Sequence, residues 1–138
     1  MVGISNLNEL LKKMKPNLKE GKFYFASVDE GELMALSGYL EYITCVYRES
    51  EGLTIVFNEE ILENMKGFTE KISGPFAMIT LEVNSDRNAI GFMEKIAGAL
   101  AKEKISCNAF SAYYHDHIFV QYERKEDAIV ALKKLQNS

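Results

Sequence analysis

The sequence has few of the residues that most often carry metal or redox chemistry. Its 138 residues include two cysteines and two histidines. Cys45 and Cys107 lie far apart, each in an apolar stretch, whereas zinc sites and redox pairs usually place cysteines in Cys-x-x-Cys spacing. We therefore expect Cys45 and Cys107 to be buried thiols, without a disulfide in a reducing compartment.

Excess positive charge is also missing. The formal net charge is −4, and a partner that binds through a phosphate backbone normally requires clustered lysines and arginines. Several lysines do gather near the N-terminus, but Glu9 and Glu20 flank them, which favours a solvated surface: Lys12, Lys13, Lys15, Lys19 and Lys22. We expect no nucleic-acid partner.

The third absence is a long apolar run. No stretch of about 18 apolar residues could span a bilayer. The start of the chain, MVGISNLNELLKKMKP, lacks the uninterrupted apolar segment of a signal peptide. We therefore expect no membrane partner and a cytoplasmic location.

Hydrophobic residues make up 47% of the chain, which is enough for a packed core. In the first half, Asn6 is expected to cap a short helix with Glu9 as its capping-box partner, and Pro16 is expected to end that helix. Strands are expected over residues 22–28, 42–49 and 53–57, with a glycine-containing loop after the first of them. Asn58 is expected to cap a further short helix.

The segment KGFTEKISGP, residues 66–75, is the best boundary, because it holds two glycines and a proline and has no clear apolar period. We therefore divide the chain into residues 1–68 and 69–138. After the boundary, the pattern predicts five elements in the order β-α-β-β-α, with Asp86 or Ser85 as the cap of the first helix. They are expected over residues 75–83, 88–104, 106–114, 117–123 and 125–135.

The short stretch YYHDHIFV joins the last two predicted strands. We expect His115 and Asp116 to form a two-residue turn, since Asp suits tight turns, and His117 to pair across from Tyr114. The β-α-β-β-α order is a ferredoxin-like plait without its last strand. We infer that a strand from the first half completes the second sheet, or that the two sheets join edge to edge, because both arrangements hide open edges.

Three segments resemble a known family: NLNELLKKMKPNLKEGKFYFASV, YRESEGLTIVF and NSDRNAIGFMEKIAGALAKEKISCNAFSAYYHDHIFVQY. They look like small bacterial and archaeal proteins built from two ACT domains in tandem. The second half is also similar to part of the tandem-ACT cytosolic arginine sensors of animals. The resemblance implies an α/β fold of the α+β plait type, with two ferredoxin-like βαββαβ modules side by side. It also implies that a small ligand, usually an amino acid, binds at an interface between modules.

ACT domains typically carry Asp-x-Pro-Gly between the first strand and the first helix. Here Asp86 matches, while Asn88 and Ala89 stand in place of the proline and the glycine. A glycine would allow the closest approach of a ligand to the backbone, so these changes bear directly on the geometry of binding.

The physical case for a ligand stands beside the resemblance. A helix N-terminus presents unpaired N–H groups and a partial positive charge, so it can hold a carboxylate. The amides of Asn88, Ala89 and Ile90 would be the donors, and Asp86 or Asn84 would accept from a ligand ammonium. The simpler alternative is that Asp86 only caps the helix. The candidate ligand-binding residues are Asn84, Ser85, Asp86, Arg87, Asn88, Ala89, Ile90, Gly91, Cys107 and Asn108, the last two because they begin the neighbouring strand.

Three sharper functions have less support. A metal site at His115 and His117 would need a third ligand, and no zinc-site spacing is present. Nothing in the sequence ties Cys45 or Cys107 to a histidine base, so we expect no catalytic residues, no enzyme activity and no cofactor. An RNA-binding plait would show aromatic residues within basic strands, whereas this chain is acidic.

The sequence therefore predicts a regulatory or sensor protein with tandem ACT domains that binds a small molecule, most simply an amino acid. Such a protein is expected to form a homodimer, because association would cover exposed sheet edges. The alternative is a ligand-free ACT-type module for protein–protein interaction, either a homodimer or an adaptor.

Overall fold

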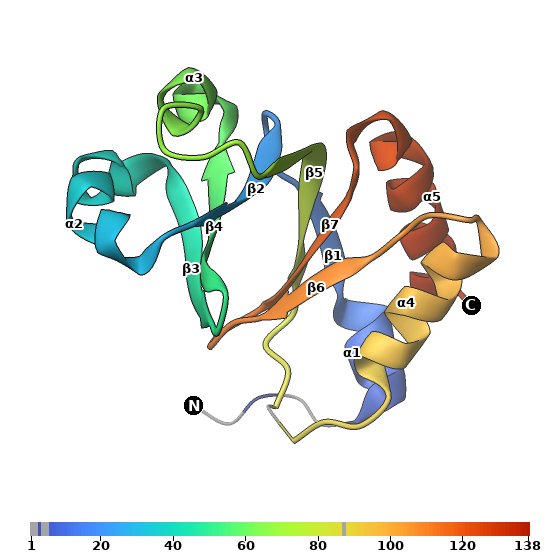
Figure 1. The fold of residues 1–138 in the computed structure, drawn as a ribbon. Coiled ribbons are helices and arrows are strands. Elements are labelled where there is room, and N and C mark those ends of the chain that lie inside the picture. The colour runs from blue at the N-terminus through green and yellow to red at the C-terminus, as the bar shows by residue number, and fades with distance from the viewer. Residues whose placement is uncertain (1–2, 4–5, 87) are drawn as a thin grey trace. The chain divides into compact units, whose positions relative to one another are not determined.

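The computed structural model describes residue 3, residues 6–86 and residues 88–138 (Figure 1). The chain forms two compact units. One is continuous in sequence, Gly21–Phe76, and is called the continuous unit below. The other combines Met1–Glu20 with Ala77–Ser138 and is called the split unit.

The continuous unit is a four-stranded antiparallel arrangement in the order β3-β4-β2-β5. Its strands are β2 (Phe23–Val28), β3 (Ile43–Glu49), β4 (Gly52–Asn58) and residues 72–76 of β5 (Ile72–Glu82). The loop expected after β2 is instead helical, over η1 (Glu30–Glu32), α2 (Leu33–Leu36) and η2 (Ser37–Tyr42). Leu36 is buried in the core of this unit, and this burial stabilises the helical conformation of the stretch.

The predicted short helix after β4 is present as η3 (Glu59–Ile61) and α3 (Leu62–Met65). The side chain of Asn58 caps it by accepting a hydrogen bond from the Glu60 amide at 2.8 Å. The strand predicted from residue 75 begins earlier, inside the boundary segment 66–75. There β5 already begins at Ile72 and continues through the cis Gly74–Pro75 bond.

The split unit shows the predicted β-α-β-β-α order. Its elements are β5 from residue 77 onward, α4 (Phe92–Lys102), β6 (Asn108–Ser111), β7 (Asp116–Gln121), η4 (Tyr122–Arg124) and α5 (Lys125–Gln136). The missing strand comes from the start of the chain. β1 (Lys15–Leu18) pairs antiparallel with β5, with Lys15 opposite Glu82 and Leu18 opposite Ile79. The expectation that a strand of the first half completes the second sheet is confirmed.

Helix α1 (Leu7–Lys13) precedes this strand, as the capping pattern predicted. The Asn6 side chain accepts from the Glu9 amide at 3.0 Å, and the helix ends at Met14. Pro16 then lies inside β1, which has β5 as its partner on one side. A proline is tolerated at such an edge because its missing N–H is not needed for pairing.

The core of the split unit lies between its strands and the three helices α1, α4 and α5 (Figure 1). Alternate residues of β5 point into it, among them Ile79 and Leu81. Fully buried side chains also come from all three helices and from the end of α1: Leu10, Met14, Ile96, Leu100 and Leu132. Within the described residues, no helix combines the length and the apolar character needed to cross a bilayer. The division of the sequence at residue 68 stays a prediction. The compact units of the structure divide the chain differently, because residues 1–20 belong with residues 77–138.

Candidate functional site

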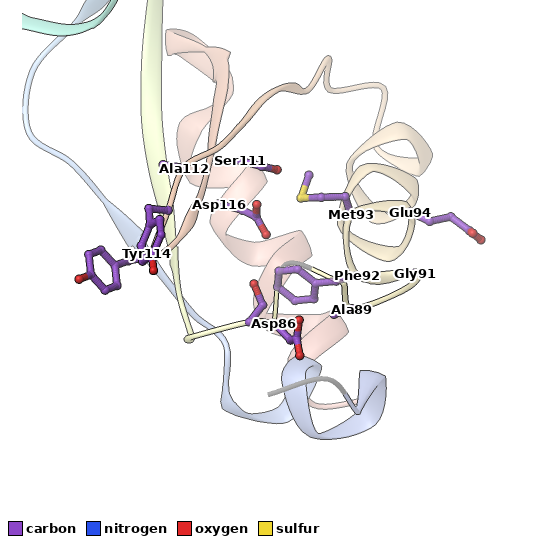
Figure 2. A pocket seen from close by; sticks show the side chains of 12 residues that line it. Asp86, Ala89, Gly91, Phe92, Met93, Glu94, Ser111, Ala112, Tyr114 and Asp116 are labelled. Carbon is purple, nitrogen blue, oxygen red and sulfur yellow. The ribbon is translucent and has the colours of Figure 1, made fainter. Parts of the chain in front are cut away.

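A cavity of about 260 Å³ opens in the split unit, between the loop after β5, the first turn of α4 and the β6–β7 hairpin (Figure 2). The loop and the first turn of α4 follow each other in the sequence, whereas the hairpin comes about twenty residues later along the chain. The lining residues are Ser85, Asp86, Ala89, Gly91, Phe92, Met93, Glu94, Ser111, Ala112, Tyr113, Tyr114 and Asp116.

The loop after β5 is held by Asp86. Its Oδ1 accepts from the Asn88 amide at 2.8 Å, and its backbone carbonyl accepts from the Ala89 amide at 2.9 Å. These two bonds form a turn of the kind that Asp side chains favour. The amides of Asn88 and Ala89 are therefore occupied within the turn and do not serve as the predicted donors.

Helix α4 begins at Phe92, four residues later than predicted, and its cap is Gly91 with φ of 90°. Asp86 is thus not the helix cap, because it stabilises the preceding turn. The first helical bond runs from the Lys95 amide to the Gly91 carbonyl at 3.1 Å. The first-turn amides without an intrahelical partner consequently belong to residues 92–94, and Met93 and Glu94 line the cavity.

The hairpin exists, but its turn is displaced from the prediction. Ser111 lies opposite Asp116, and Phe110 lies opposite His117. The connection is therefore the four residues 112–115, closed by a 3.0 Å bond from the Ala112 amide to the His115 carbonyl. This register places Ser111 and Asp116 at the mouth of the turn, where both line the cavity.

The structure brings together only part of the predicted site. Ser85, Asp86, Ala89 and Gly91 line the cavity, while Arg87 lies outside the described residues. Cys107 and Asn108 are absent from the lining because they lie at the start of β6, and its other end reaches the cavity. The other predicted residues that do not line it are Asn84, Asn88 and Ile90.

The hairpin and the first helical turn are the parts that the sequence analysis missed. In a split β-α-β unit, the helix carries the chain back, so the second strand starts far from the first strand's end and finishes near it. That rule would have pointed to Ser111 and Asp116 in place of Cys107 and Asn108.

The cavity offers two opposite electrostatic environments. The N-terminus of α4 carries the partial positive charge of the helix dipole. Asp86 and Asp116 supply carboxylates from two other segments, and Figure 2 shows Asp116 and Met93 directed toward the space between hairpin and helix. Glu94 points outward in the same view. A molecule with one anionic and one cationic group would match both environments.

The two cysteine thiols are partly buried and form no disulfide. Burial raises the pKa of the Cys107 thiol, and it does the same to the pKa of Cys45. A raised pKa favours the protonated thiol, which is the unreactive form. Among the residues that the structure describes, no three His, Cys, Asp or Glu side chains gather as a metal site.

His117 is tied to the sheet. Its Nδ1 lies 2.9 Å from the hydroxyl of Thr80, the buried threonine of the neighbouring strand β5. Burial lowers the pKa of His117, and His115 and Lys19 lower that pKa further, whereas Asp116 raises it. His117 thus serves the β5–β7 pairing as a neutral imidazole.

This environment makes stability depend on pH. Because the pKa of His117 is lowered in the folded protein, the unfolded chain binds more protons as the pH falls below the ordinary value of 6.5. We therefore expect full stability above that pH and a loss of stability on acidification toward about pH 5.5. Urea unfolding at several values between about pH 8 and 5.5 measures how the free energy of unfolding changes with pH. His117→Gln should flatten the profile. His115→Gln should weaken it only in part, because burial remains as the main cause of the lowered His117 pKa. An unchanged slope in His117→Gln contradicts the assignment.

Comparison with known protein families covers both halves of the chain. One ACT-domain family model matches residues 2–65, and a second ACT-domain model matches residues 72–134. The chain belongs to the ACT-domain family. The two ACT domains stand in tandem, as the sequence resemblance implied.

Solved structures extend the comparison. The chain is 39% identical to a protein of unknown function from Vibrio cholerae, described as a possible transport protein, with a TM-score of 0.77 over 94% of this chain and 95% of that chain. A putative C-terminal regulatory domain of aspartate kinase from Porphyromonas gingivalis is 14% identical, with a TM-score of 0.65 over 92% and 99%. The regulatory subunit of aspartate kinase from Thermus flavus is 8% identical, with a TM-score of 0.62 over 88% and 95%. The last two share the fold. A search of proteins with curated function finds no match.

Proposed function

We propose that this tandem ACT-domain protein is a cytoplasmic, non-enzymatic regulator that binds an amino acid in the cavity of its second ACT domain. The observation that carries the proposal is the meeting of the α4 N-terminus with the carboxylates of Asp86 and Asp116 around one cavity. The aspartate kinase regulatory domains that share this fold support a regulatory role.

The binding mode follows from the two environments. The ligand carboxylate accepts from the first-turn amides at residues 92–94, which a helix N-terminus presents to anions. The ligand ammonium lies between Asp86 and Asp116, where charge-assisted hydrogen bonds are stronger than neutral ones. A volume of about 260 Å³ suits a small molecule, and it is below the roughly 300–1,000 Å³ of drug-sized pockets.

Regulation requires that binding favour one arrangement of the protein over another, because a ligand with equal affinity for two states shifts neither. A homodimer is the simplest assembly to respond in this way, since ligand binding near an interface changes its stability. The partner that receives the signal is then a second copy or a protein that recognises the occupied form.

One observation favours the alternative, a ligand-free interaction module. Three large side chains near the cavity are mostly exposed: Ile90 at 86%, Tyr113 at 76% and Tyr114 at 64%. Aromatic side chains of this kind are enriched in the centres of protein interfaces. A module of this type would bury them against a partner without any small ligand.

Thermal unfolding against each of the twenty amino acids tests the proposal. A ligand present at about 100 times its dissociation constant adds roughly 2.7 kcal/mol, which raises the melting temperature of a chain of this size by several degrees. We expect a selective increase for one or a few amino acids at about 5 mM. The matched control is the amine that lacks the carboxylate of the active amino acid, which should leave the melting temperature unchanged. No shift with any amino acid would contradict the proposal and favour the interaction module.

A further inference from the structure

The N-terminal segment touches the candidate binding loop at both of its ends. At the helix end, Leu7 Cδ2 lies 3.3 Å from the point where a Cβ on Gly91 would stand. At the strand end, a Cβ on Gly3 would come within 2.6 Å of the Asp86 amide nitrogen and of the Ser85 carbonyl carbon. The backbone of residue 3 thus lies directly against the backbone of Ser85 and Asp86.

Gly91 fixes the direction in which α4 begins. Its φ of 90° is one that side chains other than glycine rarely adopt, and no side chain caps the helix there. The start of α4 is therefore held by the Gly91 backbone and by what packs against it. Leu7, which is partly buried on the core of the split unit, occupies that position.

We propose that Leu7 and Gly3 are positioning residues of the ligand site. Through them, residue 3 and α1 hold the loop after β5 so that the first-turn amides of α4 face the cavity. This inference rests on the proposed function for its biological meaning, but the mechanical coupling itself is a property of the protein without ligand. The coupling makes Gly3 and Leu7 part of a site whose lining residues all lie in the second ACT domain.

Amide hydrogen exchange of the full-length protein without ligand tests the coupling. The reporters are three amides that donate to acceptors of the loop. Asn88 donates to Asp86 Oδ1, Ala89 to the Asp86 carbonyl, and Lys95 of α4 to the Gly91 carbonyl. We expect Leu7→Ala to remove protection from these amides by more than its loss of global stability accounts for. Leu7→Met, which keeps most of the volume, should restore that protection.

Leu11→Ala is the matched control, because Leu11 lies one turn further along α1 and packs against the same core. It should lower loop and core protection together, as a purely structural change does. Identical exchange patterns in Leu7→Ala and Leu11→Ala, after correction for global stability, would overturn the proposal.

A second pair of variants separates backbone strain from the contact with Leu7. In Gly91→Ala, the new side chain is strained by the positive φ and comes close to Leu7. In Gly98→Ala, in the same helix, no atom of the described residues beyond the adjacent residues and the helix backbone lies within 4 Å of the new Cβ. We expect Gly91→Ala to lose loop protection and Gly98→Ala to keep it. In the double variant Leu7→Ala/Gly91→Ala, the losses should be less than additive, because Leu7→Ala removes the side chain that the new Cβ at residue 91 would meet. Strict additivity would count against the coupling. Intact coupling in a protein that no amino acid stabilises would count against the proposed function alone.

Discussion

Deletion of residues 1–20 is expected to unfold the split unit, even though the predicted second module, residues 69–138, stays complete in sequence. The deletion removes Leu10 and Met14, which are both fully buried. Truncating such side chains to Ala costs about 2–5 kcal/mol each, and a domain has only about 5–15 kcal/mol of stability in total. It also strips β1 from β5 and leaves that strand with an open edge. Two-dimensional NMR of the shortened protein should show collapsed amide dispersion for residues 77–138.

Moving the segment tests whether its position along the chain matters. The Gln136 side chain donates to the Lys12 carbonyl at 3.0 Å, so the end of α5 lies beside α1. A rearranged chain, residues 21–138 followed by a flexible linker and residues 1–20, should regain the dispersion, because the linker lets α1 and β1 return to their places beside α5 and β5. A folded second module in the shortened protein would show that β1 and α1 are dispensable, contrary to the packing described here.

The missing strand could be predicted, but its identity could not. The β-α-β-β-α order leaves a plait one strand short, and this shortage is visible in the sequence. β1, however, is Lys-Pro-Asn-Leu, which has no β-branched or aromatic residue and contains a proline that indicates the end of a helix. Its strand geometry comes from pairing with β5, which is a tertiary effect that local propensity does not record.

The loop that lines the cavity was predicted, but its local geometry was not. The polar loop after β5 was found because Asp86 was expected to cap the following helix and matches the first position of the family's Asp-x-Pro-Gly. The start of α4 was misplaced because Ala89 continues the apolar period of the helix, although Asp86 draws the chain into a separate turn. The family's usual glycine is replaced by Ala89, yet Gly91 provides a left-handed residue two positions later. The hairpin was misplaced because Tyr113 and Tyr114 have high strand propensity, whereas both side chains are exposed in the turn.

Asp116→Asn is expected to abolish most of the stabilisation by the amino acid that raises the melting temperature. The substitution keeps the size and removes the charge that the ligand ammonium would meet, and hydrogen bonds to charged groups contribute about 1.5–3 kcal/mol. Glu94→Gln is the matched control, because Glu94 also lines the cavity but points outward (Figure 2). It should keep nearly the full shift. Both variants should be compared without ligand first, so that intrinsic stability is known.

The pH of this experiment matters because Asp116 raises the pKa of the adjacent His117. Removing the Asp116 charge lowers that pKa further, so at pH 8 the imidazole is neutral in the wild type and in both variants. Any difference at pH 8 then reports the ligand contact and not the state of the histidine. Equal loss of the ligand shift in Asp116→Asn and Glu94→Gln would point to the general negative field of the cavity. Full retention in both variants would place the ligand ammonium elsewhere and contradict the role of the hairpin. A selective loss in Asp116→Asn would assign one end of the ligand to the hairpin and, by the size of the cavity, the other end to the first turn of α4.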